Sequence, residues 1–258
     1  MNDDSPREDH FVQSLARGLQ VIKVFGPHRA EMSLSDVARE GGLTRAAARR
    51  YLLTLVDLGY MRTDGRLFRL APRILELGYA YLSSLSLPRV AGPHLEWLVR
   101  ETGESSSMSV LDSSEIVYVA RVPTTRIMTV AISVGTRFPA HATSMGLVLL
   151  AGLERDQLDP YLAGIDLSTA PEGAAATLED LHAALKQVRN QGFSLVDQEI
   201  EQGLRALAAP VHDRQGRVIA AISVSAHVSR LSKDKARRQF LPLLLEAAQR
   251  IETDLRPS

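Results

Sequence analysis

The sequence predicts an α+β protein built from two folded parts, a small helical part followed by a larger part with a mainly antiparallel sheet. Residues 11–72 contain three helical patterns and then a hairpin signal. From residue 88 onward, strand-like runs are joined by hairpin-length turns and the helical patterns come in blocks, which is typical of α+β domains. A chain of 258 residues with 45% hydrophobic and 23% charged residues has the length and composition for two such globular parts.

Composition excludes several classes of protein. The chain has no cysteine, so it has no disulfides, thiolate zinc sites, iron–sulfur clusters or cysteine nucleophiles. The apolar run 147–153 is far shorter than the roughly 20 residues that a membrane span needs. Residues 1–10 are polar and acidic, unlike a signal peptide, and we expect them to form a disordered leader of a cytoplasmic protein. The seven histidines lack metal-ligand spacing and no nucleotide-binding motif is present, so we expect no metal and no cofactor.

The first part begins with an amphipathic helix over 11–25, in which Leu15, Leu19 and Ile22 share one face. Ser33 and Asp36 then have capping-box spacing at the start of a short helix that stops at Gly41-Gly42. Thr44 is placed to cap the next helix, which runs to about Leu58. Two helices joined by a tight glycine turn predict a helix-turn-helix.

Positive charge is concentrated around the second of these helices. Residues 43–73 carry seven arginines and two aspartates, although the whole chain has 30 basic and 30 acidic residues. A solvated arginine-rich face would explain the charge alone, but Asp64-Gly65 between two alternating runs predicts a hairpin directly after the basic helix. This order favours a winged helix-turn-helix that binds DNA over a purely structural three-helix module. The predicted DNA-binding residues are Thr44, Arg45, Ala46, Arg49, Arg50 and Arg66.

Residues 73–87 predict a helix between the two parts. Ile74, Leu77, Tyr81 and Leu85 recur on one side of it, and the serine-rich stretch before Pro88 ends it. Such a helix could be a plain linker or part of a dimer contact, and its apolar stripe favours contact. We therefore expect a DNA-binding domain over 11–72, a linker helix over 73–87 and a second domain over 88–258.

The second domain alternates between strand and helix patterns. Helical periodicity appears at 93–101, 144–152, 178–190 and 234–254. The strand-like runs are 107–111, 116–122, 128–134, 193–200, 204–211 and 217–226.

One segment of this domain suggests an enzyme. Ala142-Thr143-Ser144-Met145-Gly146 differs by one residue from the Gly-x-Ser-x-Gly nucleophile elbow, and Asp197 and His212 follow in the chain order of hydrolases. An elbow needs an apolar strand directly before the serine, whereas 135–141 predicts a loop with a proline. A small-molecule hydrolase with Ser144 as nucleophile is therefore the alternative, and we expect Ser144 instead to cap an apolar helix.

Several longer motifs resemble those of a known family. The segments are Ser14–Leu19, Leu43–Leu52, Tyr118–Val122, Thr143–Gly146, Gln198-Glu199, Gly203–Arg205 and Ala209–Val211. In this order they resemble the isocitrate-lyase-regulator (IclR) family of bacterial transcription factors, most closely its branch controlling protocatechuate and β-ketoadipate catabolism. The resemblance covers residues 11–255.

The resemblance implies a winged helix, a linker helix and a GAF-like effector domain that binds a small organic acid. It also implies dimers or dimers of dimers on operator DNA, in a regulator of an aromatic-compound catabolic operon. The branch has an arginine directly after Ser-Met-Gly, where this chain has Leu147. The effector-binding residues implied are Ser144, Met145, Gly146, Asp197, Leu204, Ala206, Ser223 and Ser225.

The strand over 217–226 is compatible with a pocket. Ser223 and Ser225 alternate with Ile222 and Val224, so one face is apolar and the other is small and hydroxylic. The spacing alone favours serines that face water, as on many antiparallel strands, and the family resemblance reverses this preference in favour of a pocket. Met145, Leu204 and Met128 would form its apolar wall. We expect an aromatic or dicarboxylic effector of the 4-hydroxybenzoate, protocatechuate or β-ketoadipate type.

Overall fold

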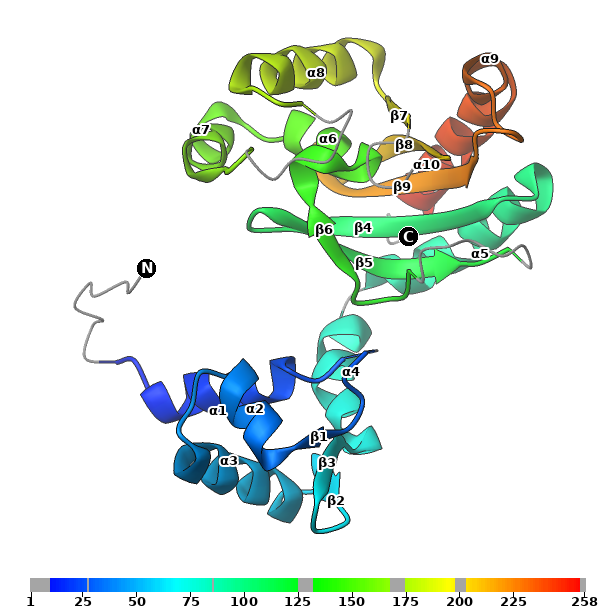
Figure 1. Ribbon diagram of the computed structural model, residues 1–258. Coiled ribbons are helices and arrows are strands. Elements are labelled where there is room, and N and C mark those ends of the chain that lie inside the picture. The colour runs from blue at the N-terminus through cyan, green and yellow to red at the C-terminus, as the bar shows by residue number, and fades with distance from the viewer. Residues whose placement is uncertain are drawn as a thin grey trace. The chain divides into compact units, whose positions relative to one another are not determined.

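The computed structural model describes residues 10–26, 28–84, 86–124, 132–167, 175–197 and 203–255. The chain divides into two compact units, residues 1–84 and residues 85–258 (Figure 1). Each unit contains its own hydrophobic core, and the predicted α+β class is confirmed. Among the described residues, no helix combines the length and apolar character needed to cross a bilayer.

The N-terminal unit is a winged helix-turn-helix, as the sequence predicts. Its three-stranded antiparallel sheet has the order β1-β3-β2, and Val21, Val37, Leu52, Met61 and Phe68 are among the residues of its core. The elements are α1 (Gln13–Lys23), β1 (Met32–Ser33), α2 (Leu34–Glu40), α3 (Arg45–Asp57), β2 (Met61–Thr63) and β3 (Leu67–Leu70).

The buried side of α1 differs from the predicted one. Val21 and Phe25 pack into the core, whereas Leu15 and Leu19 are exposed. The helix carries apolar residues on two sides, and periodicity alone does not say which side meets α3. The exposed side is therefore available for other contacts.

The predicted linker helix is divided in the structure. A 3-10 turn, η1 (Pro72–Ile74), precedes α4 (Leu75–Ser84), and the next helix, α5 (Ser86–Thr102), begins the C-terminal unit. Leu75 and Tyr79 of α4 are each 71% exposed. The apolar residues of α4 thus have little cover from their own unit.

The C-terminal unit is built on a six-stranded sheet with the order β6-β5-β4-β9-β8-β7, in which every pairing is antiparallel. The sequence did not predict β6, which pairs with β5 and is held there by ion pairs from Arg137 to Glu115 and Asp112. Most of the strand predicted at 128–134 lies outside the described residues. The strands are β4 (Ser105–Asp112), β5 (Glu115–Val122), β6 (Arg137–Pro139), β7 (Ser194–Asp197), β8 (Leu204–His212) and β9 (Val218–His227).

Helices cover both faces of this sheet (Figure 1). The helices α5 and α10 (Leu241–Asp254) pack on one face, and α6 (Ser144–Ala151) packs on the other beneath α8 (Leu178–Gln191). The helix α7 (Arg155–Gly164), which contains Pro160, was not predicted. Towards the C-terminus, α9 (Lys233–Lys235) and a π-helical stretch (Ala236–Phe240) lead into α10. All eight residues of α6 are buried, so this helix forms the centre of its layer.

Candidate DNA-binding surface and effector pocket

The helix-turn-helix is defined by two hydroxyl caps and one glycine. Ser33 Oγ accepts a hydrogen bond from the Asp36 amide at 3.3 Å, and Thr44 Oγ1 accepts one from the Ala47 amide at 3.2 Å. Between the helices, Gly42 has φ +59°, a left-handed conformation that a glycine adopts without strain. The Leu43 amide then donates to the Ala38 carbonyl at 2.8 Å, which closes the turn and sets the direction of α3.

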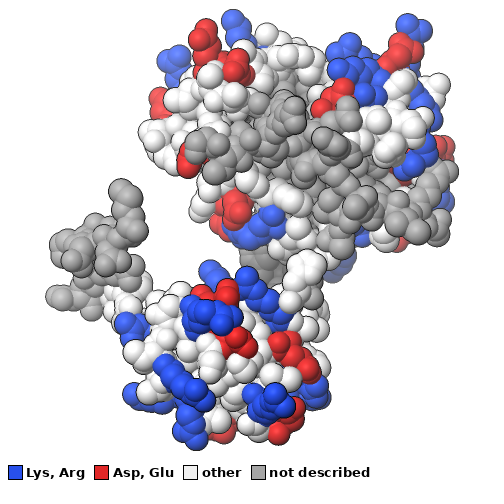
Figure 2. Space-filling model, viewed as in Figure 1, with Lys and Arg blue, Asp and Glu red and all other residues white. Residues whose placement is uncertain are grey.

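The outward face of α3 carries arginines that no carboxylate of the described residues neutralises. Arg45, Arg49 and Arg50 are exposed, and none forms an ion pair with another described residue. Ala48, Leu52 and Leu55 fill the opposite, buried face, while Tyr51 and Leu53 are half-buried. Figure 2 shows Lys and Arg side chains gathered over this part of the N-terminal unit. The helix therefore presents positive charge outward from its first turn.

The wing is a tight hairpin whose turn is held by Asp64. Asp64 Oδ1 accepts from the amides of Arg66 at 2.8 Å and Leu67 at 2.7 Å, and these hydrogen bonds lower the pKa of the Asp64 carboxyl below its usual value. Gly65 has φ +91°, which the turn requires. The Arg66 side chain at the tip is exposed and has no ion pair among the described residues.

The other arginines of the basic segment are partly used within the fold. Arg69 pairs with Glu31 at 2.8 Å. Arg73 donates to the Leu58 carbonyl at 3.0 Å and lies over the Tyr60 ring, 5.3 Å from its centroid. These contacts attach η1 to the end of α3, so Arg73 has a structural role.

In the C-terminal unit, the predicted effector residues converge between α6 and the sheet. A small cavity of about 20 Å³ lies there. It is lined by Tyr118, Ile132, Thr143, Ser144, Met145, Leu204, Ala206, Ser223 and Ser225. Six of the eight residues implied by the resemblance are in this lining.

The start of α6 is fixed by a very close approach of two backbones. Thr143 caps the helix, its Oγ1 accepting from the Gly146 amide at 2.8 Å. A Cβ on Gly146 would lie 2.0 Å from the Ala140 carbonyl oxygen, so Gly146 permits the approach without lining the cavity. The backbone N–H groups of Ser144 and Met145 have no hydrogen-bond partner in the described part of the chain, and both residues line the cavity.

The sheet face beneath α6 is rich in small hydroxyls. Ser107 on β4 lies opposite Ser223 on β9, and Ser105 lies opposite Ser225. Ser223 is only 2% exposed, and its hydroxyl makes no hydrogen bond to the described residues. In the same row, Arg121 of β5 donates to Ser107 Oγ at 3.2 Å, and burial lowers the pKa of its guanidinium.

Asp197 does not line the cavity, although the resemblance implies that it binds effector. Its register partner is Arg205, whereas the cavity residue Ala206 pairs with Val196, so strand alternation turns Asp197 to the opposite face. Burial acts to raise the pKa of the Asp197 carboxyl, but hydrogen bonds from Lys233 and Arg205 outweigh it and lower the pKa. The carboxylate thus holds β7 to β8 and to α9.

Comparison with known proteins agrees with this geometry. Residues 79–253 match the family described as bacterial transcriptional regulator IclR C-terminal, and residues 14–65 match the IclR helix-turn-helix domain. The Pca regulon regulatory protein of Pseudomonas putida is 42% identical over 240 residues, covering 93% of this chain and 82% of that protein. The p-hydroxybenzoate hydroxylase transcriptional activator of Acinetobacter baylyi is 37% identical, covering 95% and 92%.

The chain belongs to the IclR family. It is a DNA-binding transcriptional regulator and not an enzyme. Among solved structures, an IclR homologue from Microbacterium hydrocarbonoxydans in complex with 4-hydroxybenzoate superposes with a TM-score of 0.82 at 29% identity, covering 95% of this chain and all of that one.

The hydrolase alternative finds no support in this IclR-family fold. Ser144 follows a 3-10 turn, η2 (Ala140–Ala142), and not a strand, and Thr143 rather than Ser144 caps the helix. The other two residues that a triad would need are occupied elsewhere: Asp197 pairs with Arg205, and His212 pairs with Glu252. No group of three His, Asp or Glu side chains within the described residues is placed to hold a metal ion.

Sequence reasoning missed three residues that line the cavity of this IclR-family protein. Tyr118 and Thr143 stand inside motifs that were recognised, but their orientation depends on strand register and on which residue caps α6. Ile132 was assigned to a strand, and it carries no signal beyond being apolar. Burial raises the pKa of the Tyr118 phenol to about 12, so the hydroxyl stays protonated and can donate. Met128, the other predicted wall residue, lies outside the described residues.

Proposed function

We propose that this chain is a ligand-responsive regulator of an operon for aromatic-compound catabolism and acts in the cytoplasm, where the operator lies. Residues 11–72 would bind operator DNA, 73–87 would link, and 88–258 would bind a small organic acid. The observation that carries the proposal is the pair of features described above: exposed, unneutralised arginines on α3, and a hydroxyl-lined cavity at the start of a buried helix. Two relatives named as regulators of pca and p-hydroxybenzoate genes support the aromatic class.

DNA recognition is assigned to the face of α3 and the tip of the wing. The N-terminal end of a recognition helix enters the major groove, where arginine forms bidentate hydrogen bonds with guanine. Arg45 and Arg49 are one turn apart at that end, with Ala46 beside them leaving room for base edges. Arg50 and Arg66 are assigned to the phosphate backbone, which attracts cations of any geometry. Thr44 is assigned there too: its Oγ1 accepts from the Ala47 amide, and its hydroxyl proton can donate to a phosphate oxygen.

We expect R49A to lose about 1–3 kcal/mol of operator-binding free energy and to relax specificity at one base pair, because a bidentate contact is lost. R66A is expected to weaken binding to all sequences evenly and to reduce the salt slope by roughly one. Fluorescence anisotropy with DNA from upstream of the coding sequence measures both. The control is R238A, which removes an exposed arginine from the other unit. Unchanged affinity in both R45A and R49A would contradict the assignment.

Self-association is assigned to the exposed apolar residues of α4. Leu75 and Tyr79 lie on one side of this helix and Leu77 and Tyr81 on the other, and all four are at least half exposed. Exposed large apolar side chains gathered on one short helix are typical of an interface. One winged helix reads only a short site, so a dimer or a dimer of dimers would provide the specificity that an operator requires.

Sedimentation should therefore give at least a dimer for the natural chain at micromolar concentration. Replacing both Leu75 and Tyr79 by serine should shift the equilibrium towards the monomer and weaken operator binding, because the interface loses its apolar contacts. Leu178→Ser, a change at an exposed leucine of α8, is the control. A natural chain that is monomeric and still binds its operator with full affinity would refute the assignment.

The effector site is assigned to the cavity between α6 and the sheet. A buried carboxylate needs charge-assisted donors, and the Ser144 and Met145 amides stand at the positive end of the α6 dipole. Arg121 of β5 adds a cation on the sheet face that carries Ser107 and Ser223. A cation from the sheet is relevant because this chain has Leu147 in α6, in place of the arginine expected after Ser-Met-Gly. The hydroxyls of Ser144, Ser223 and Ser225 would hold ring substituents against Met145 and Leu204. A cavity of 20 Å³ has room for about one water, so binding requires its walls to move apart.

Binding of 4-hydroxybenzoate, protocatechuate or β-ketoadipate should raise the melting temperature in a concentration-dependent way. Ser223→Val should abolish this rise, because two methyl groups replace the hydroxyl and one Cβ hydrogen, which removes the hydrogen-bonding group and fills part of the cavity. Ser194→Val is the matched control: Ser194 is a buried serine on the same sheet face, opposite Ala208, and does not line the cavity. Calorimetry that finds S223V binding effector as tightly as the natural chain would show that the pocket is misplaced.

A further inference from the structure

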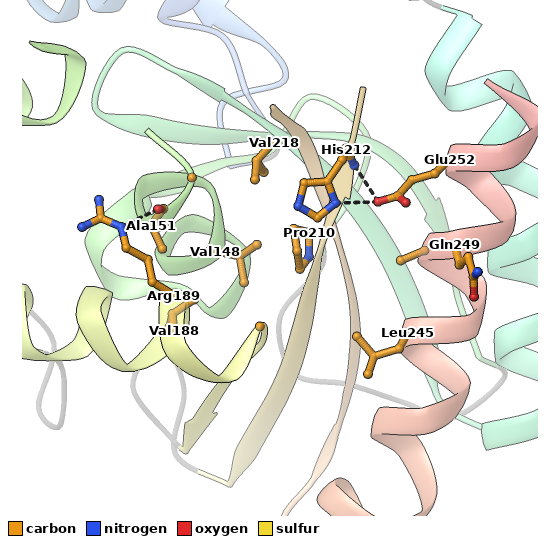
Figure 3. A pocket seen from close by; sticks show the side chains of 13 residues that line it. Val148, Ala151, Val188, Arg189, Pro210, His212, Val218, Leu245, Gln249 and Glu252 are labelled. Atoms are coloured by element: carbon orange, nitrogen blue, oxygen red, sulfur yellow. Dashed lines mark hydrogen bonds and ion pairs between the residues drawn. The ribbon is translucent and has the colours of Figure 1, made fainter. Parts of the chain in front are cut away.

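A second and larger cavity lies in the C-terminal unit, at the opposite end of α6. Its volume is about 420 Å³, within the range of small-molecule sites. Residues of α6, α8, β8, β9 and α10 surround it (Figure 3). Most of its wall is apolar, formed by Val148, Ala151, Val188, Pro210, Val218, Leu245 and Ala248.

One corner of this cavity is polar, and its hydrogen bonding is defined. Glu252 Oε1 accepts from the His212 amide at 2.8 Å and lies 2.7 Å from His212 Nδ1 (Figure 3). Because a carboxylate only accepts, Nδ1 carries the proton in the neutral ring and Nε2 is an acceptor. Neither Nε2 nor the second carboxylate oxygen of Glu252 has a hydrogen-bond partner within the described residues. The corner therefore offers two acceptors.

The cation near the cavity is turned away from this corner. Arg189 Nε donates to the Ala151 carbonyl at 2.7 Å, and Nη2 donates to the Leu153 carbonyl at 3.4 Å. Figure 3 shows its guanidinium directed towards Ala151, so mainly the side-chain stem faces the cavity. Arg189 thus holds the C-terminal end of α6, and the charge nearest the acceptor corner is the negative charge of Glu252.

We propose that this cavity binds a neutral phenol: a flat apolar ring that places one hydroxyl against His212 and Glu252. The hydroxyl donates its one proton to the second carboxylate oxygen of Glu252, and the ring replaces water against the apolar wall. A carboxylate ligand is disfavoured because Glu252 would repel it. The site is therefore chemically opposite to the acid-binding pocket at the start of α6.

The test uses 4-fluorophenol as the probe. Its binding to the full chain is measured by titration monitored with fluorine NMR. The natural chain should bind it saturably with a stoichiometry of one per chain. Glu252→Gln should weaken binding by about tenfold or more, because the amide keeps an oxygen for His212 but turns a donor towards the cavity. Glu246→Gln is the matched control, an exposed carboxylate on the same helix that does not line the cavity.

A third variant distinguishes the two pockets. Ser223→Val should leave 4-fluorophenol binding unchanged, and 4-fluorobenzoate should not bind saturably to that variant. Thermal melting of each variant verifies that it is folded. The proposal is overturned by the absence of saturable phenol binding, by equal affinity in E252Q and the natural chain, by loss of phenol binding in S223V, or by saturable benzoate binding to S223V.

Discussion

The C-terminal unit depends on the complete burial of α6 between the sheet and α8. A helix buried on all sides needs close approaches at its ends, and two glycines allow them. A Cβ on Gly146 would collide with the Ala140 backbone, and a Cβ on Gly152 would lie 2.5 Å from two carbon atoms of the Val218 side chain. Because these backbones and side chains are in close contact, a ligand that enlarges the cavity at the start of α6 must displace the helix or its neighbours.

The distribution of arginine partners separates the two roles of positive charge in the N-terminal unit. Arg69 and Arg73 are paired with carboxylates and fix the wing and the start of η1. Arg45, Arg49, Arg50 and Arg66 stay unpaired among the described residues, at the cost of local repulsion. Since exposed ion pairs contribute little to stability, leaving these four unpaired costs the fold little and keeps them available for DNA phosphates and bases.

Local signals in the sequence were sufficient where short-range chemistry decides the structure. The caps at Ser33 and Thr44, the turn at Gly42 and the hairpin at Asp64-Gly65 each depend on a few neighbouring residues, and all were predicted. Packing between residues far apart in the chain could not be predicted from the sequence. Which side of α1 is buried depends on α3, and the orientation of Asp197 depends on register with β8. Ser223 was identified only because of the family resemblance, since the strand pattern alone favours serines that face water.

A small organic acid bound at the start of α6 should change the affinity of the chain for its operator. The most direct measurement is the fluorescence anisotropy of labelled operator DNA with the full chain, titrated with 4-hydroxybenzoate, protocatechuate and β-ketoadipate in turn. At least one acid should shift the operator affinity of the natural chain and of S194V, and the same acid should have no effect on S223V. Operator affinity that none of the three acids changes, or that changes equally in S223V, would contradict it.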